Sequence, residues 1–147
     1  MAADGIYVSF PDYQVETDTN FGKQPFGHGM VIAVDEQTGN TRGSEYGRYS
    51  NDGKIKGKAR RVTVPSFKMT KPGSPTQQEL DAYAKQLDKV YGHSGGRTQI
   101  TYIKDADYNK LVNMMKSAET KQDTGFYQTR PYNICTHNCG TYASDML

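Results

Sequence analysis

The sequence has no tryptophan, only two cysteines, and a 35% share of hydrophobic residues that is low for a globular domain. Proline and charged residues occur at ordinary levels and no segment is of low complexity, so the chain is predicted to fold rather than to be disordered. The two cysteines, Cys135 and Cys139, lie close together near the C-terminal end. A disulfide between them would close too short a loop to restrain the unfolded chain, so we expect no structural disulfide.

Long apolar runs and a strong charge of one sign are also lacking. No stretch approaches the roughly 18 apolar residues of a membrane span, and residues 1–5 lack the basic and apolar regions of a signal peptide. We therefore expect synthesis in the cytoplasm without membrane insertion. The formal net charge is only +2, and the basic stretch at residues 54–61 alternates charged with small or apolar residues. This pattern favours a solvated strand face over an anionic partner such as a nucleic acid.

The first half of the chain has the patterns of strands and turns. With 147 residues and no visible linker or internal repeat, residues 1–147 are interpreted as a single domain. The apolar run at residues 27–34 and the turn residues at 35–40 predict a buried strand that enters a hairpin. We expect strands at residues 5–15, 27–34, 42–50 and 59–67. The first is interpreted as a strand or extended arm that ends in a turn at Pro11, and the fourth is expected to end near Pro65. The last three are expected to be adjacent in an antiparallel sheet.

In the second half the hydrophobic period changes to that of a helix. Thr76 and Glu79 form a capping box, and the apolar residues that follow share one helical face until Gly92. Alternation at residues 98–104 predicts another strand, and Asp105 or Asp107 is expected to cap the helix after it. The chain is therefore predicted to belong to the α+β class, with an antiparallel sheet packed against helices.

The last ten residues predict a further helix with a cysteine at its start. Asn138 is the expected N-cap, which places Cys139 in the first turn. Free backbone N–H groups at a helix start favour a thiolate and can hold an oxyanion, so Cys139 is a candidate nucleophile. Cys135 precedes the helix and is interpreted as a packed cysteine without chemistry.

A cysteine nucleophile needs a base, and the chain offers three histidines. His28 lies between two glycines at the start of the apolar strand, where a substrate or the cysteine helix has room to approach, and it is the preferred base. His93 stands in a glycine loop and is interpreted as a solvated residue. His137 is too close to Cys139 in the chain to turn its ring onto the sulfur, so it is ranked as an accessory residue.

The imidazole in turn needs an orienting group on a neighbouring element. Glu45 is the preferred candidate because it lies on the strand expected to pair with the His28 strand. Asp35 and Tyr46 remain rivals, since the register of the hairpin is not fixed by the sequence. We expect no metal or cofactor: the C-terminal Cys and His residues supply three donors without a fourth, and no glycine-rich phosphate loop is present.

Three short motifs together resemble a known family. They are Gly27-His28-Gly29 on one strand, Glu45-Tyr-Gly-Arg-Tyr49 on the next, and Asn138-Cys139-Gly-Thr-Tyr142 at the C-terminal helix. This order resembles the circularly permuted, NlpC-like branch of the papain superfamily, in which the histidine strand comes first and the nucleophile helix late. The resemblance implies a permuted papain-like fold, with Cys139 as nucleophile, His28 as base and Glu45 as the third polar residue.

Within this branch the chain looks most like the peptidoglycan amidase effectors of bacterial type VI secretion systems. That resemblance implies an antibacterial toxin that hydrolyses peptide bonds in peptidoglycan stem peptides. It also implies delivery by the secretion apparatus into the periplasm of a target bacterium, and a cognate immunity protein in the producing cell.

Two other classes of function remain open at this point. The same permuted order resembles lecithin retinol acyltransferase-like enzymes and some isopeptidases, so a thiol acyltransferase, deamidase or isopeptidase acting on a protein or lipid is one alternative. A noncatalytic binding module is the other. The absence of an apolar anchor or amphipathic membrane helix from the sequence argues against a lipid substrate.

Overall fold

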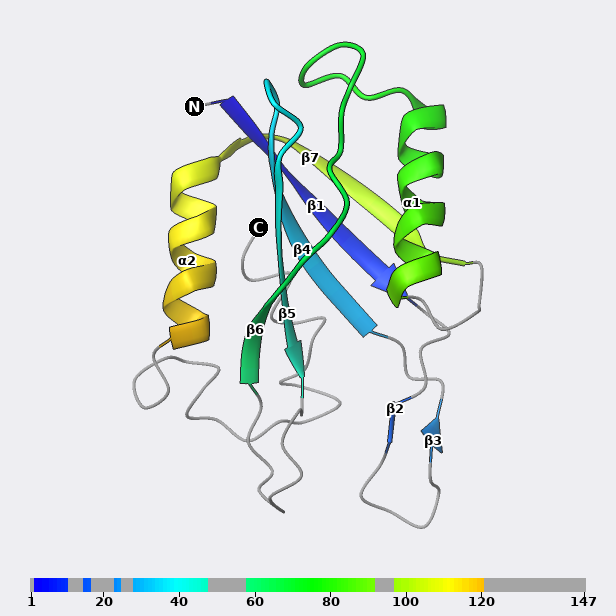
Figure 1. The fold of residues 1–147 in the computed structure, drawn as a ribbon, viewed down its shortest axis with the longest axis vertical. Coiled ribbons are helices and arrows are strands. Elements are labelled where there is room, and N and C mark those ends of the chain that lie inside the picture. Colours follow the sequence, from blue (N-terminus) through cyan, green and yellow to red (C-terminus); the bar gives the residue numbers. More distant parts are fainter. Residues whose placement is uncertain are drawn as a thin grey trace.

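The computed structural model describes residues 2–10, 15–16, 23–24, 28–47, 58–91 and 97–120. In these residues a five-stranded antiparallel sheet is accompanied by a two-stranded sheet and two helices (Figure 1). The larger sheet contains β1 (Ala2–Phe10), β4 (His28–Asp35), β5 (Thr41–Gly47), β6 (Lys58–Val62) and β7 (Gln99–Asp107). The helices are α1 (Gln77–Tyr91) and α2 (Tyr108–Thr120), and the small sheet pairs β2 (Val15–Glu16) with β3 (Lys23–Gln24). The α+β class and the antiparallel sheet are confirmed.

The strand order of the larger sheet is β6-β5-β4-β1-β7. The adjacent strands β4, β5 and β6 match the three that the sequence predicted side by side. In the turn between β4 and β5, the Asp35 carboxylate accepts the backbone N–H groups of Gln37 and Thr38 at 2.9 and 3.3 Å. The position of β1 was not predicted: it pairs with β4 on one side and with β7 on the other.

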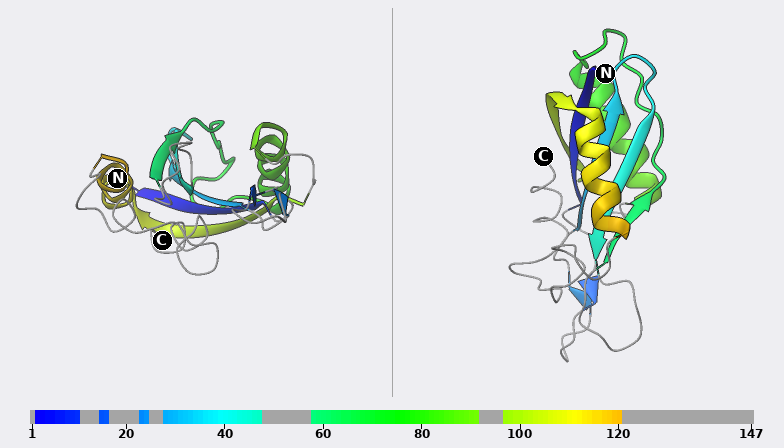
Figure 2. Two further views of the ribbon diagram at one scale, coloured as in Figure 1. Left: turned by 90° about the horizontal axis from the view of Figure 1, so that it is seen from below. Right: turned by 90° about the vertical axis from the view of Figure 1, so that its left-hand side faces the viewer.

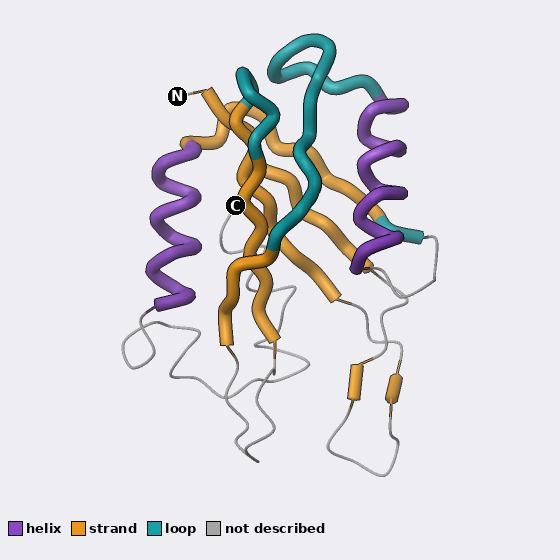
Figure 3. Tube along the Cα trace, in the orientation of Figure 1, coloured by secondary structure: helices purple, strands orange, loops and turns teal. Residues whose placement is uncertain are grey.

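The end of one strand differs from the prediction. The strand expected at residues 59–67 ends at Val62, and the chain then crosses the face of the sheet as the loop drawn in teal in Figure 3. Pro65 explains this departure, because its carbonyl accepts hydrogen bonds from Tyr83 at 2.7 Å and Thr41 at 3.1 Å instead of joining a ladder. The first strand ends at Phe10, directly before Pro11, as the sequence predicts.

Both described helices begin at the expected caps. The Glu79 N–H donates to the Thr76 hydroxyl at 3.1 Å, and the Thr76 N–H donates to the Glu79 carboxylate at 2.9 Å, which is a complete capping box. At α2 the Lys110 N–H donates to the Asp107 carboxylate at 3.0 Å, so Asp107 is the cap. Asp105, the alternative cap, instead has a left-handed backbone with a φ of 61°.

Replacing Thr76 with alanine should lower the free energy of unfolding by about 1 kcal/mol, because the first turn of α1 loses a partner for an otherwise unpaired N–H group. Denaturant unfolding followed by circular dichroism measures this change. Gln78→Ala is the matched control at an exposed position of the same turn. An equal loss in both variants would show that the cap contributes nothing of its own.

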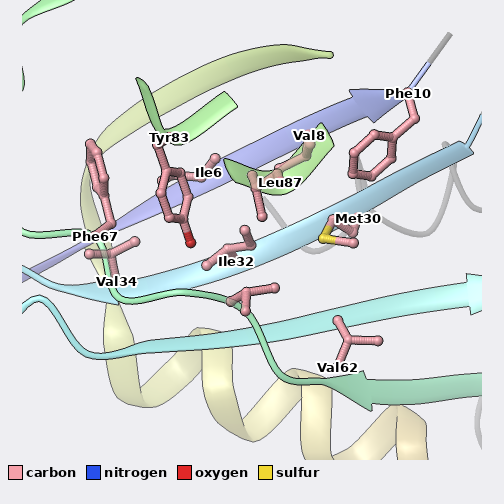
Figure 4. Close-up of a cluster of buried hydrophobic side chains, with 11 residues drawn as sticks. Ile6, Val8, Phe10, Met30, Ile32, Val34, Val62, Phe67, Tyr83 and Leu87 are labelled. Atoms are coloured by element: carbon pink, nitrogen blue, oxygen red, sulfur yellow. The ribbon is translucent and has the colours of Figure 1, made fainter. Parts of the chain in front are cut away.

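The two helices cover opposite faces of the larger sheet. α1 packs on the face formed by alternate residues of β1 and β4, and Figure 4 shows its Tyr83 and Leu87 directed at these strands. The buried cluster on this face contains Ile6, Val8, Phe10, Met30, Ile32, Val34, Val62, Val64, Phe67, Tyr83 and Leu87. α2 packs on the other face against Val31, Ala33, Tyr46 and Ala59. The strands lie between the helices (Figure 2), and neither of these two helices is long and apolar enough to span a membrane.

A buried ion pair joins α2 to the sheet. The Arg42 guanidinium donates from Nη1 and Nη2 to the two carboxylate oxygens of Glu119, at 3.0 and 2.6 Å. The Ser44 hydroxyl contacts the same carboxylate at 3.4 Å. The Arg42 and Glu119 side chains are only 8% and 9% exposed, so this is a desolvated contact between β5 and the last turn of α2.

Candidate active site

His28 and Glu45 meet on the α1 face of the sheet, where β4 begins. Met30 is the residue paired with Glu45 across the two strands, and His28 lies two residues before Met30. Residues two apart in a strand share a face, so His28 and Glu45 are diagonal neighbours. The His28 Nε2 lies 2.6 Å from Glu45 Oε2, and the two side chains are only 12% and 5% exposed. The structure therefore brings together two of the three residues that the sequence singled out.

A third charged residue completes a row across β4, β5 and β6. Arg60 is directly opposite Glu45 in the β5–β6 pairing. Its Nε and Nη2 both donate to Glu45 Oε1, at 2.8 and 2.7 Å. Both carboxylate oxygens of Glu45 are thus engaged, one by His28 and the other by Arg60. The sequence indicated Arg60 only as part of a solvated basic face.

These contacts fix the ionisation of Glu45. Burial is the largest influence and raises the pKa of this carboxyl, but the hydrogen bonds and charges of His28 and Arg60 outweigh it, so the pKa lies below its ordinary value. Glu45 is therefore ionised at neutral pH and can only accept hydrogen bonds. It follows that His28 Nε2 is the donor in the pair, and that the lone pair of the neutral imidazole is on Nδ1.

Two aromatic residues flank this row. The Phe10 ring is stacked on the His28 ring at an interplanar angle of 12°, with the ring centroids 6.2 Å apart. Phe10 is paired with His28 across β1 and β4 and is itself buried, so it restricts the plane of the imidazole. Tyr91, the last residue of α1, donates its hydroxyl hydrogen to the Thr63 carbonyl. Burial raises the pKa of Tyr91, and the charge of Glu45 raises it further, which places α1 beside the site.

The rival partners of His28 lie elsewhere. Asp35 is at the other end of β4, where its carboxylate caps the hairpin turn. Tyr46 packs on the α2 face. Among the described residues, no group of three or more His, Cys, Asp or Glu side chains is placed to hold a metal ion.

The remaining sequence candidates are outside the described residues. They are Cys135, His137 and Cys139 near the C-terminal end, and His93 after α1. The C-terminal helix expected to carry Cys139 lies in the same undescribed part of the chain. What the described part supplies is a partly buried imidazole with one nitrogen held by a carboxylate, an arrangement that can act as a general base with its orienting group.

Comparisons with known proteins give the same family from sequence and from structure. A family model described as type VI secretion system effector TseH-like matches residues 5–147, a range that contains His28, Glu45 and Cys139. The chain is also similar to the crystal structure of the type VI secretion system effector TseH, with a TM-score of 0.74 and 27% sequence identity, covering 99% of this chain and 74% of that chain. A search of curated proteins found no match.

Proposed function

The chain belongs to the TseH-like family of type VI secretion system effectors, and from that premise we propose that it is a cysteine amidase or endopeptidase that hydrolyses peptide bonds of bacterial peptidoglycan. An effector of this system is exported by the secretion apparatus without a signal peptide. We place its action in the periplasm of the target bacterium, where stem peptides are accessible. A toxin of this kind requires a cognate immunity protein in the producing cell.

The 2.6 Å contact between His28 and Glu45 is the observation that carries this proposal. It joins a candidate base that is 12% exposed to an orienting carboxylate that is 5% exposed and ionised, so that the carboxylate can only accept the hydrogen bond. In the proposed reaction His28 Nδ1 accepts the thiol proton of Cys139, and the sulfur attacks the carbonyl carbon of the scissile amide. The Cys139 N–H and a neighbouring donor stabilise the oxyanion.

The second half of the reaction returns the enzyme to its starting state. Imidazolium His28 protonates the leaving amine, the carbon–nitrogen bond breaks, and a thioester forms on Cys139. His28 then takes a proton from water while the resulting hydroxide attacks the thioester. The carbon–sulfur bond breaks, the carboxylic acid product leaves, and imidazolium His28 returns its proton to the sulfur of Cys139. Glu45 stabilises the imidazolium in both halves because its carboxylate is ionised.

The proposed scaffold is the circularly permuted papain-like, NlpC-like fold. Its support here is the order of the elements: the histidine strand β4 is followed by β5 with Glu45, and Cys139 comes late in the chain. In such a fold the C-terminal helix would place Cys139 against the end of β4 where His28 lies.

Incubation of the purified protein with peptidoglycan sacculi tests the function directly. Chromatography and mass spectrometry of the muropeptides should show loss of cross-linked species or shortened stem peptides. Sacculi treated with the Cys139→Ala variant should give the same muropeptide profile as untreated sacculi. Sedimentation with sacculi and an unchanged profile from the wild-type protein would instead establish a binding module. Transfer products or deamidated peptides would establish the alternative thiol chemistry.

Replacing Glu45 with glutamine should reduce turnover by about 10- to 100-fold without abolishing it. The amide oxygen can still accept a hydrogen bond from the imidazole, but the charge that stabilises imidazolium is lost. Rates of muropeptide release measure the effect. Asp35→Asn is the control, because Asp35 caps the distant turn, and its turnover should match the wild type. The reverse order of effects would make Asp35 the partner of His28 in solution.

A further inference from the structure

Arg60 differs from the solvated arginine that the basic stretch predicts. Its guanidinium contacts Glu45 through two nitrogen atoms, although the side chain is 48% exposed. The next residue, Arg61, is on the other face of β6, opposite Ser44, and it is exposed. Two adjacent arginines of one strand therefore have different surroundings, and only the first contacts the site.

The form of the contact limits how the Glu45 carboxylate can turn. Both donors of Arg60 converge on Oε1, which leaves Oε2 for His28 Nε2. Rotation of the carboxylate about its last side-chain bond would break both hydrogen bonds to the guanidinium. A guanidinium is planar with donors in a fixed fork, so it resists that rotation more strongly than a single flexible donor would.

We propose that Arg60 is a positioning residue of the site, which holds the Glu45 carboxylate in the orientation that presents Oε2 to His28. The effect on turnover rests on the proposed function, whereas the effect on Glu45 does not. Arg60 acts on the imidazole only through Glu45.

The charges around Glu45 indicate how the loss of Arg60 would change the pKa of this carboxyl. Among the described residues, the groups that face this carboxylate are His28 from β4, Arg60 from β6 and Tyr91 from α1. Burial raises the pKa of Glu45, and the two basic residues lower it. Without Arg60, His28 is the one basic residue of the described part that still opposes the effect of burial on the pKa of Glu45. The carboxyl should then bind a proton at higher pH, and a protonated carboxyl cannot stabilise an imidazolium.

The first experiment measures Glu45 itself, so it does not depend on activity. Carbon-13 NMR of protein labelled at the glutamate carboxyl gives the titration of Glu45, whose resonance is the one absent from Glu45→Gln. In Arg60→Met the midpoint should rise by about one pH unit, whereas Arg61→Met, with the same change of charge on the other face, should leave it unchanged. Equal titrations in Arg60→Met and the wild type would overturn the proposal. Arg60→Lys, which keeps the charge, gives the same test if Arg60→Met does not fold, with a smaller rise expected.

The second experiment measures the consequence for turnover of a purified cross-linked muropeptide dimer. Arg60→Met should lower kcat about 10-fold with little change in KM, because the residue orients the base and does not hold the substrate. Arg60→Lys should recover part of the loss, and Arg61→Met should equal the wild type. An unchanged kcat in Arg60→Met would overturn the positioning role.

The two experiments separate the two hypotheses. A wild-type protein that cuts no muropeptide, together with a shifted Glu45 titration in Arg60→Met, would refute the proposed function and support the orientation of Glu45 by Arg60. A wild-type protein that cuts the dimer, together with an unshifted titration, would refute the role of Arg60 and leave the proposed function intact.

Discussion

Replacing either Cys139 or His28 with alanine should abolish hydrolysis of peptidoglycan, with a fall in turnover of at least about 10⁴-fold. Without the thiol no acyl-enzyme can form, and without the imidazole neither the thiolate nor the leaving amine has a proton partner. Because the two residues act as one unit, the double variant should be no slower than either single variant. Muropeptide release by the three variants, with circular dichroism to verify folding, measures this.

Cys135→Ser is the matched control for the nucleophile. It removes the other thiol of the chain, which precedes the expected helix start and lacks its electrostatic activation. Its turnover should remain close to that of the wild type. An inactive Cys135→Ser variant together with an active Cys139→Ala variant would refute the assignment of the nucleophile and the permuted arrangement inferred from it.

Breaking the buried ion pair of Arg42 and Glu119 should give the largest loss of stability, about 3 to 5 kcal/mol for Glu119→Ala. Glu119→Ala is costly because it leaves the Arg42 guanidinium buried without the carboxylate that compensates for its loss of water. Lys116→Met, on an exposed position of α2, should change the free energy of unfolding by no more than about 0.5 kcal/mol. Guanidinium chloride unfolding curves of the two variants give the comparison.

The double variant Arg42→Met with Glu119→Leu distinguishes the ion pair from simple packing. Apolar residues of similar length can fill the space without leaving a charge, so much of the stability should return. Two results would show that the contact is not the desolvated pair that the distances indicate. One is a loss of less than about 1 kcal/mol in Glu119→Ala. The other is a double variant that loses more free energy of unfolding than Arg42→Met and Glu119→Leu lose together.

Local patterns account for the parts of the fold that the sequence predicted. Thr76 with Glu79, and Asp107 before α2, are helix starts because their side chains bond backbone groups a few residues away. The turn at Asp35 is local in the same sense. The end of β6 at Val62 was missed, because it depends on Tyr83 and Thr41 binding the Pro65 carbonyl from elsewhere in the fold.

The residues of the site likewise divide into those predicted from local patterns and one that was missed. His28 and Glu45 lie in one hairpin, so their neighbourhood follows from a short turn and an alternating pattern. Arg60 was missed because its contact depends on the register between β5 and β6, which the sequence does not fix. The sequence did offer one indication: Arg60 is a charged residue on the strand expected beside that of Glu45, which is acidic. The choice of Glu45 over Asp35 and Tyr46 required the register itself.

The place of β1 between β4 and β7 affects the order in which the protein can fold. This strand precedes the other described strands in the sequence, yet one of its edges pairs with β7, which begins at Gln99. During synthesis β1 can find β4 early, but its second edge stays open until the ribosome has also made β7. Contacts so distant in sequence slow the search for the native state, so folding should take milliseconds to seconds rather than microseconds. Until β7 arrives, the exposed edge of β1 is the place where a nascent chain is most prone to pair with another molecule.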